Sequence, residues 1–402
     1  MSQREVYIID GARTAFGRMG GSIRHLFGSK LASITIKGLL DKTEIQKRGR
    51  VDCVLMGSAF HCSQAQNPAR WASLDAELGH GISATFLETQ CGTGIDAINL
   101  AASKILAGLA DVVIAGGFES HSNRFAKFPM SVPAYKLIPP AAVKQQLSPV
   151  PEEQLVMGIT AENLVEMYLI SREDQDNYSY NSQMRTKASM EQGVYSDSII
   201  PIKVPGDKKN PGFDFVKDEQ PRPDTTIEGL AKLKPVFKEG GTVTAGNSSG
   251  LNDGASCVLM MSSEKAMELG YEPSVRWVTG ADIGCDPKIM GIAPAYVIPI
   301  ALKRAGLKLR DFDTIECNEA FAAQNLAVIK ELEKQTGEQV DMAKWNPLGG
   351  AVSLGHPNGA SGARICIFAM KQLARTGGKY GLIASCCGGG LGVASVLENL
   401  KR

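Results

Sequence analysis

An internal repeat constrains the fold of this chain more than any other feature of its sequence. Residues 51–60 (VDCVLMGSAF) have the pattern of a strand that runs into a loop, and residues 312–321 (FDTIECNEAF), 261 positions later, have the same pattern. Each segment is followed by a glycine-rich turn, an amphipathic helix and a buried strand. A repeated unit of this kind predicts a chain built from two similar halves.

The two repeat units predict an α/β architecture. Their strands, residues 111–116 and 380–385, are short apolar runs, and each follows a helical pattern with apolar residues spaced by threes and fours. Strands that alternate with helices at this spacing favour a mostly parallel sheet. The apolar helix positions are Ile95, Ile98, Ala102, Ile105 and Leu109 in the first half, and Ala363, Ile367, Met370 and Ala374 in the second.

The segment between the halves, residues 121–249, has a different composition. It contains a proline-rich piece at 131–151 and a charged, proline-containing piece, but helical patterns interrupt them at 161–168 and 173–190. Because periodic apolar positions indicate a folded segment, we predict an inserted loop domain; low-complexity disorder is the alternative. The predicted domains are residues 1–120 plus 250–272, 121–249, and 273–402.

Charge and targeting signals exclude several classes of protein. Among the 402 residues, 43 Lys and Arg balance 42 Asp and Glu, so the net charge of +1 argues against nucleic acid as a partner. No apolar run reaches the roughly 18 residues needed to span a bilayer. A strand pattern at residues 6–9 leaves no room for a signal peptide, and nine cysteines without metal-site spacing indicate free thiols. These features predict a cytoplasmic enzyme without a bound metal.

Cys91 is the first candidate for chemistry. It follows an extended segment, residues 84–90, and precedes a glycine-containing turn, 92–94, and the first helix. A cysteine at a helix N-terminus is exposed to the positive end of the helix dipole, which favours the thiolate. The pattern predicts a nucleophile, and a buried structural cysteine is the alternative.

His356 occupies the equivalent point of the second half, within the sequence GHPNGASG at 355–362. Corresponding loops of a duplicated fold lie at the same end, so His356 is expected near Cys91. A Cys–His pair is a standard way to activate an acyl-accepting nucleophile. An isolated loop histidine would otherwise be a surface residue.

Two further strand ends carry polar groups. Cys386, in SCCGGGLG at 385–392, can offer a thiol next to backbone N–H groups suited to an oxyanion. Asn318, in NEAF at 318–321, can orient a water or an oxygen. The alternatives are a tight glycine turn in the first case and a helix cap in the second.

Together these segments resemble the thiolase family. The resemblance extends from residue 6 to residue 400 and is carried by five motifs in the family's order, at 90–94, 243–255, 318–321, 355–362 and 386–390. Segments 10–17 and 157–163 are also similar to the family. The resemblance implies a five-layered α/β/α/β/α core of two similar halves with an inserted loop domain, and a dimer or a dimer of dimers.

The resemblance also implies a mechanism. His356 would deprotonate Cys91, which would take an acyl group from a coenzyme A (CoA) thioester, and Cys386 would act as acid and base at the α-carbon. One oxyanion hole would use His356 and a water held by Asn318, and the other the backbone N–H groups of Cys91 and Gly388. CoA would be a substrate, with no permanently bound cofactor. The residues implied to contact it or the acyl chain are Arg222, Ser249, Met157, Phe237, Met290 and Phe321.

The implied reaction is reversible cleavage of a 3-ketoacyl-CoA by CoA, or the reverse condensation. Val156 stands where many short-chain biosynthetic members have histidine, which favours the degradative branch of fatty acid β-oxidation with some chain-length breadth. A biosynthetic, acetoacetyl-CoA-specific enzyme and a non-catalytic acyl-CoA-binding protein are the alternatives. Two other departures are Asn358 in place of an aliphatic residue and Cys387, which leaves open which thiol of the pair reacts.

The sequence also has features of two other enzyme classes. Residues 246–250 (GNSSG) match the G-x-S-x-G elbow of serine hydrolases, which requires a buried strand before it and a helix after it. A condensing ketosynthase would share the fold but pair its cysteine with two histidines, and here Cys386 or Asn318 matches the second position.

Overall fold

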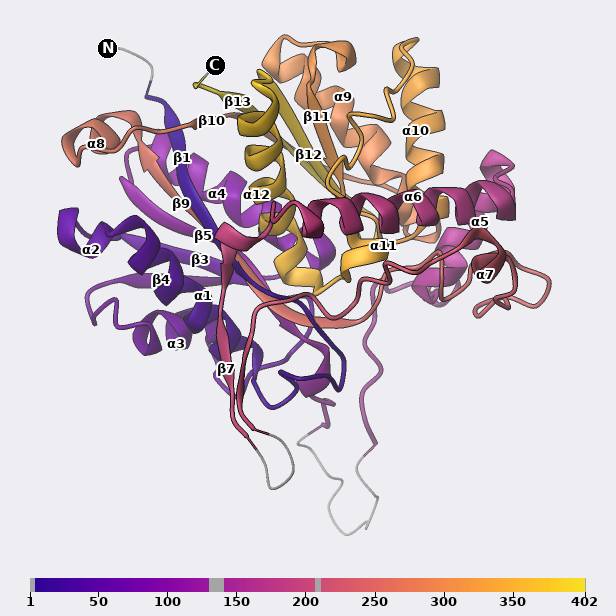
Figure 1. The fold of residues 1–402 in the computed structure, drawn as a ribbon, viewed down its shortest axis with the longest axis horizontal. Coiled ribbons are helices and arrows are strands. Elements are labelled where there is room, and N and C mark those ends of the chain that lie inside the picture. The colour runs from indigo at the N-terminus through magenta and orange to yellow at the C-terminus, as the bar shows by residue number, and fades with distance from the viewer. Residues whose placement is uncertain (1–3, 130–140, 207–210, 402) are drawn as a thin grey trace.

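The computed structural model describes residues 4–129, 141–206 and 211–401. Residues 131–140 of the proline-rich piece predicted at 131–151 lie outside these ranges. The two halves of the chain stand side by side, with the N-terminal half at the lower left of Figure 1 and the C-terminal half at its upper right. The loop domain runs along one side of both.

The N-terminal half contains a five-stranded mixed sheet. Its central strands are buried along their whole length, as expected for a sheet covered on both faces. The parallel strands are β4, β3 and β5, and β9 and β1 extend the sheet in antiparallel fashion. In the order of the sheet, the strands are β4 (Ser83–Leu87), β3 (Cys53–Gly57), β5 (Val112–Ser120), β9 (Asn252–Ser262) and β1 (Val6–Thr14).

The C-terminal half repeats this topology, which confirms the predicted duplication. A parallel pair is again followed by two antiparallel strands, so β11 corresponds to β3 and β12 to β5. The strands are β11 (Thr314–Cys317), β12 (Tyr380–Cys387), β13 (Leu391–Asn399) and β10 (Val275–Gly284). Residues 6–8 of β1 pair with residues 275–277 of β10, so the two sheets join edge to edge.

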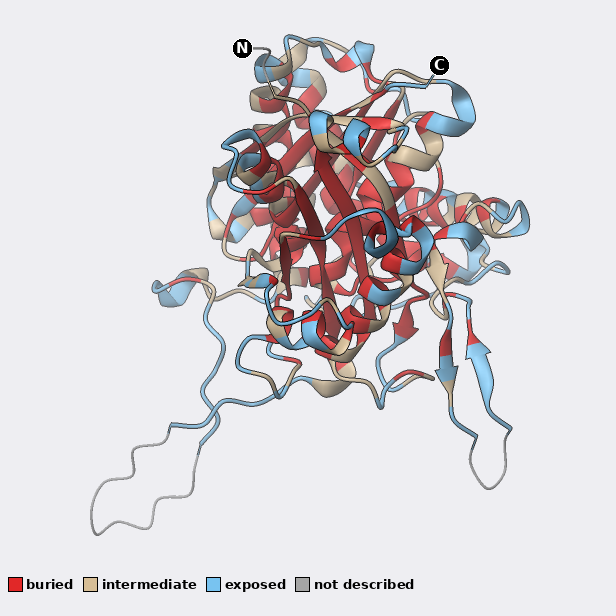
Figure 2. Ribbon diagram, turned by 90° about the vertical axis from the view of Figure 1, so that its left-hand side faces the viewer, coloured by how far each residue is buried: buried red, intermediate tan, exposed pale blue. Residues whose placement is uncertain are grey.

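Three helical layers cover the sheets and complete the five-layered core that the sequence predicts. The central layer is α4 (Thr93–Leu106) and α12 (Asn358–Thr376), whose apolar faces pack between the sheets. The outer layers are α1 (Gly28–Thr43) with α3 (Pro68–Asp75), and α9 (Ala293–Ala305) with α10 (Ala322–Thr336). Figure 2 shows the buried strands and helices as one continuous core.

The central helices touch where each has a glycine. A Cβ at Gly94 would lie 2.6 Å from the backbone nitrogen of Ala363, so only glycine permits this approach. The sequence pattern extends the first helix too far, because α4 ends at Leu106 and Leu109 lies beyond it with 74% of its surface exposed. The three- and four-residue spacing of apolar positions continues to Leu109, although the chain has already left the core there.

The predicted loop domain contains the two helices expected from its periodicity. These are α5 (Met157–Tyr168) and α6 (Arg172–Glu191), and a capping box of Ser171 and Asp174 begins α6. Two residues of this segment return to the core, where β6 (Ile199–Ile200) pairs with β1. The other elements are β2 (Gly17–Arg18), α2 (Ile45–Arg48), β7 (Ile202–Val204), β8 (Phe213–Phe215), α7 (Ile227–Ala231), α8 (Ser263–Glu268) and α11 (Ala351–Leu354).

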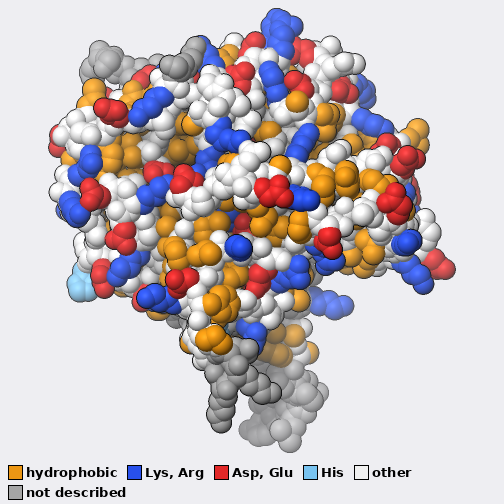
Figure 3. All heavy atoms as spheres, viewed as in Figure 1, with side chains coloured by type: hydrophobic (Ala, Val, Ile, Leu, Met, Phe, Trp, Pro, Cys, Tyr) orange, Lys and Arg blue, Asp and Glu red, His pale blue; other side chains and the backbone are white. Residues whose placement is uncertain are grey.

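The surface and helices of the described residues carry three further findings. Lys and Arg side chains mix with Asp and Glu over the face drawn in Figure 3, rather than forming an area of one sign. No helix in the described ranges has both the length and the apolar character to cross a membrane. Those ranges also contain no group of three or more His, Cys, Asp or Glu side chains placed to hold a metal ion.

Candidate active site

Cys91 lies in a tight turn between β4 and α4. The turn, Gln90–Gly92, is a single 3₁₀ turn in which Gln90 has φ 49°, and it leads directly into the first turn of α4. The Cys91 side chain is buried, and its sulfur accepts a hydrogen bond from Nδ2 of Asn358 at 3.1 Å. The structure therefore presents this thiol to a partner from the second half of the chain.

Burial decides the protonation state of Cys91. Removal from water raises the pKa of the thiol to about 11, although hydrogen bonds from Asn358 and from the backbone N–H of Gly388 lower it and Glu119 raises it. The position at a helix N-terminus does not overcome this desolvation. Burial therefore opposes the thiolate that the helix N-terminus was expected to favour, and the raised pKa favours the neutral thiol.

His356 is held from both sides of its ring and from its backbone. Its backbone N–H donates to Oδ1 of Asn252 at 3.0 Å, and its Nδ1 lies 2.6 Å from Oγ of Ser361. The Ser361 hydroxyl donates to the carbonyl of Pro357 at 3.2 Å, so its oxygen accepts from Nδ1–H. This assignment leaves Nε2 unprotonated. Burial lowers the pKa of His356 to about 3, so the ring is neutral and can accept a proton.

Asn318 lies next to His356 at the end of β11. Its Nδ2 is 3.4 Å from Nε2 of His356, and its backbone N–H donates to Ala384 of the neighbouring strand β12. Its side-chain oxygen is buried and has no hydrogen-bond partner among the described residues. Asn318 does not cap α10, because the N-cap of that helix is Phe321.

The structure connects these predicted residues in two groups. Asn318 contacts His356, and Cys91 contacts Asn358, which is two residues from His356 and begins α12. No hydrogen bond joins His356 to Cys91 in the described part of the chain. Proton transfer between them therefore stays a prediction.

The two adjacent thiols of β12 point to opposite faces of the sheet, because successive side chains of a strand alternate. Cys387 packs into the central core, where its sulfur would lie 2.5 Å from a Cβ placed on Gly92. Cys386 packs on the other face, in a small apolar cluster with Met290 and Phe321. Only Cys386 therefore faces the residues predicted to contact the acyl chain.

Four predicted acyl-contacting residues come together around Cys386. Met290 and Phe321 are buried in the cluster, and Met157 and Phe237 pack against it half-buried. The Phe237 and Phe321 rings meet edge to face with centroids 6.1 Å apart. These residues come from the loop domain and the C-terminal half, so the cluster spans the junction between them.

The two residues predicted to contact the rest of CoA lie outside this cluster. Ser249 is half-buried, and its backbone N–H donates to the carbonyl of Ala320. Arg222 is exposed, and its backbone N–H donates to Gln183 on α6. A separate cleft of about 870 Å³ reaches Gln90 and Gly388 beside Cys91, and none of the six predicted CoA or acyl contacts lines it.

The serine elbow considered from sequence does not form. Ser248 donates its hydroxyl to the carbonyl of Thr244 at 2.7 Å, and the chain continues into strand β9 rather than into a helix. A nucleophile elbow needs a strand before the serine and a helix after it. This geometry excludes the serine hydrolase interpretation.

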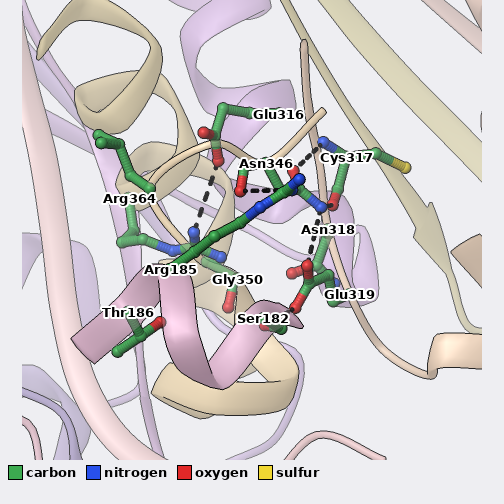
Figure 4. A network of polar contacts seen from close by, with 12 residues as sticks. Ser182, Arg185, Thr186, Glu316, Cys317, Asn318, Glu319, Asn346, Gly350 and Arg364 are labelled. Atoms are coloured by element: carbon green, nitrogen blue, oxygen red, sulfur yellow. Dashed lines mark hydrogen bonds and ion pairs between the residues drawn. The ribbon is translucent and has the colours of Figure 1, made fainter. Parts of the chain in front are cut away.

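Glu319 anchors the loop that carries Asn318 (Figure 4). Its carboxylate accepts from Oη of Tyr178 at 3.0 Å and from Oγ of Ser182 at 2.7 Å, both on α6. It also accepts from Nδ2 of Asn346 at 3.0 Å and the backbone N–H of Val352 at 3.2 Å. One buried carboxylate thus joins the loop domain to the strand end that holds Asn318.

We expect Glu319→Ala to destabilise the protein by on the order of 3 kcal/mol, because it removes an acceptor that four buried donors share. Urea denaturation measures the effect. Glu239→Ala, at an exposed position, is the matched control and should change the free energy of unfolding by less than about 0.5 kcal/mol. An equal, small change in both variants would contradict the anchoring role.

Several site residues escaped the sequence analysis. Asn252 and Ser361 lie within quoted motifs, but only the fold shows that both hold His356. Glu319 follows Asn318 directly, but only the fold shows that its carboxylate accepts hydrogen bonds from α6. His121 follows the strand of the first repeat unit, and its position at the end of that strand was the signal that could have identified it.

Residues 6–264 match the family model described as "Thiolase, N-terminal domain", and residues 271–399 match "Thiolase, C-terminal domain". The chain belongs to the thiolase family. It is therefore an acyltransferase of the thiolase type, which catalyses thiolytic cleavage or the reverse condensation.

Relatives and solved structures match over almost the whole chain. An acetyl-CoA acetyltransferase of Chromobacterium violaceum is 43% identical over 98% of this chain and 99% of its own length. A beta-ketoadipyl-CoA thiolase of Acinetobacter baylyi is 39% identical over 99% of this chain and 100% of its own. The crystal structure of human mitochondrial 3-ketoacyl-CoA thiolase superposes with a TM-score of 0.91 at 37% identity, covering 99% of this chain and 100% of the human one. A structure of that human enzyme in complex with CoA has a TM-score of 0.89 at 37% identity, covering 99% and 98%.

Proposed function

We propose that Cys91 accepts the acyl group and that His356 takes the thiol proton as the sulfur attacks. The resting state described above, a neutral thiol and a neutral imidazole with Nε2 free, is the state from which such a transfer starts. In cleavage, the Cys91 sulfur bonds to the 3-keto carbon, and the bond to the α-carbon breaks. The electron pair of that bond leaves with the acetyl-CoA enolate.

Cys386 completes the cycle in this proposal. Its thiol protonates the α-carbon of the departing enolate, and the resulting thiolate then takes the proton of the incoming CoA thiol. The CoA sulfur bonds to the acyl carbon, the bond from that carbon to the Cys91 sulfur breaks, and the released sulfur regains its proton from His356. In condensation the same thiolate removes an α-proton.

Two donor sets would hold the developing oxyanions. One is the backbone N–H of Cys91 with that of Gly388, which already points at the Cys91 sulfur. The other is His356 with a water on Asn318, whose buried oxygen lacks a protein partner. Each preorganised donor of this type contributes about 10²- to 10³-fold in rate.

One observation carries the assignment of residues. Asn318 and Cys386 lie at the ends of the paired strands β11 and β12, Asn318 contacts His356, and the carbonyl of Cys91 accepts a hydrogen bond from Oγ of Ser385 at 3.4 Å, next to Cys386. Cys386 there faces the apolar cluster, and Cys91 is hydrogen-bonded to the loop of His356. These contacts support the proposed roles of Cys91 as nucleophile, His356 as base and Cys386 as a second acid.

We infer a 3-ketoacyl-CoA substrate with breadth in chain length. The cluster beside Cys386 is apolar, and the neighbouring Val156 is 64% exposed, so the position offers no charge to a short polar acyl group. The names of the relatives range from acetyl-CoA acetyltransferase to beta-ketoadipyl-CoA thiolase, which leaves an acetoacetyl-CoA-specific enzyme as the alternative.

Thiolysis of acetoacetyl-CoA and of 3-ketodecanoyl-CoA by the purified protein tests this proposal, with acyl-enzyme trapping by mass spectrometry. We expect turnover of both substrates within about tenfold of each other, and an acyl mass on the peptide of Cys91. Turnover of acetoacetyl-CoA alone would establish the short-chain alternative. The absence of turnover and of adduct would leave a non-catalytic acyl-CoA-binding role.

A homodimer or homotetramer in a reducing compartment such as the cytoplasm, with a role in β-oxidation, completes the proposal. The edge strand β4 has half-buried and exposed residues, with Leu100 and Leu109 exposed beside it. An unpaired strand edge of this kind suits pairing with a second copy. All nine cysteines are free thiols, which supports the reducing compartment.

A further inference from the structure

Asn358 lies between a second histidine and the sulfur of Cys91. Its Oδ1 is 2.7 Å from Nε2 of His121, and its Nδ2 is 3.1 Å from Sγ of Cys91. The two contacts fix the orientation of the Asn358 amide. The Cys91 sulfur needs a hydrogen-bond donor when it becomes a thiolate, so the NH₂ group faces Cys91 and the amide oxygen faces the His121 imidazole. Asn358 begins α12, whereas His121 follows β5, so the chain of contacts crosses between the halves.

His121 has one polar partner in this arrangement. The ring is buried, and its Nδ1 has no hydrogen-bond partner among the described residues. Since Oδ1 of Asn358 accepts a hydrogen bond, Nε2 carries the proton and Nδ1 does not. Burial lowers the pKa of His121 to about 4, which keeps the ring neutral and the Nε2 proton available to Asn358.

The His121–Asn358 pair is separate from the groups that we assign to proton transfer. His356 contacts Asn318 and Ser361, and His121 contacts Asn358. Asn358 also occupies a position where the family resemblance implies an aliphatic residue. Asn358 is half-buried, and an amide there that only filled space would be less favourable than an aliphatic side chain, because the partial desolvation of its polar atoms must be offset by hydrogen bonds.

We propose that Asn358 is a positioning residue that holds the Cys91 sulfur by a hydrogen bond, and that His121 fixes the orientation of its amide. The inference rests on the proposed role of Cys91 as the acyl acceptor. The donor strengthens as the sulfur becomes negative, since a hydrogen bond to a charged group is about twice as strong as one between neutral groups. It therefore acts when the proton leaves Cys91 and again when the acyl group departs.

The groups whose charge bears on Cys91 lie on three sides of it. Glu119 lies near the end of β5 and His121 follows that strand, His356 precedes α12, and Cys386 and Cys387 end β12. Of these, burial raises the pKa of Glu119 to about 7, so this carboxyl can titrate in the same range as an enzymatic assay. All variants used in the test retain Glu119, so comparing the variants with the wild type at each pH cancels the effect of its titration.

The test is the pH dependence of alkylation of Cys91 by iodoacetamide, read by mass spectrometry of its peptide with half-buried Cys285 as reference. In Asn358→Leu we expect the apparent pKa of Cys91 to rise by about one unit, which slows alkylation at pH 7 up to about tenfold. His121→Leu should shift the pKa in the same direction. His121→Gln keeps a donor near the position of Nε2 and should restore the wild-type profile.

The outcomes separate this inference from the proposed function. Alkylation needs neither CoA nor turnover, so an inactive protein that shows the shift would keep the positioning pair and overturn the function. An unchanged profile in Asn358→Leu, or an equal shift in His121→Leu and His121→Gln, would overturn the pair. If Asn358→Leu does not fold, as judged by thermal unfolding, the two His121 variants decide.

Discussion

Replacement of Cys91 by alanine is expected to lower thiolysis by at least about 10⁴-fold, because removal of a covalent nucleophile leaves only binding and oxyanion stabilisation. The acyl mass on the peptide of residue 91 should also disappear. Steady-state kinetics with 3-ketoacyl-CoA and trapping by mass spectrometry measure the two effects. The fold should persist, since the thiol makes few polar contacts, namely the hydrogen bonds from Nδ2 of Asn358 and from the backbone N–H of Gly388.

Cys366→Ala is the matched control for this experiment. Cys366 is also a buried free thiol, but it lies within α12 and packs in the central core. Its loss should cost about 1 kcal/mol of stability and leave turnover within a few-fold of the wild type. Residual turnover above 10% in the Cys91 variant would contradict covalent catalysis at this residue.

Replacement of Cys386 by alanine is expected to separate the two half-reactions. Exchange of the α-protons of acetyl-CoA with D₂O should fall by about 10²- to 10⁴-fold, the usual effect of removing a general acid–base group. Acetylation of Cys91 by acetyl-CoA needs no proton transfer at the α-carbon and should fall by much less. Mass spectrometry follows deuterium in acetyl-CoA and the acetyl group on the protein in one sample.

Cys387→Ala is the matched control, because the two thiols are adjacent in the sequence. Cys387 is the adjacent thiol but lies on the opposite face of β12, against Gly92 and the central core. We expect it to retain proton exchange within a few-fold of the wild type. Equal loss of both half-reactions in the Cys386 variant, or loss of exchange in the Cys387 variant, would reject the assigned role.

The duplication and the positions of the site loops could be predicted from the sequence. Apolar periodicity and the repeated strand pattern are local properties, and α4, α12, β5 and β12 form in the segments they indicate, although α4 ends before Leu109. Equivalent loops of a duplicated fold lie at the same end, so Cys91 and the segment of His356 could be expected to meet. The single joined sheet was not predictable, because it depends on edge pairing between residues 6–8 and 275–277.

The protonation states and the side-chain connections depended on the tertiary structure. The helix N-terminus of Cys91 is visible in the sequence and favours a thiolate, but burial, which raises the pKa of this thiol, depends on packing. Strand alternation predicts that Cys386 and Cys387 face opposite ways, but only packing shows which one meets the apolar cluster.

The sequence by itself determined the family architecture, the repeat and the set of candidate reactive residues, since these follow from patterns that each segment carries within itself. Only the tertiary structure decided which neighbour each polar group has. His121 and Asn358 are 237 positions apart, and Tyr178 and Glu319 are 141 apart. Hydrogen bonds act over about 3 Å, so such partners are defined only when packing brings distant segments of the chain together.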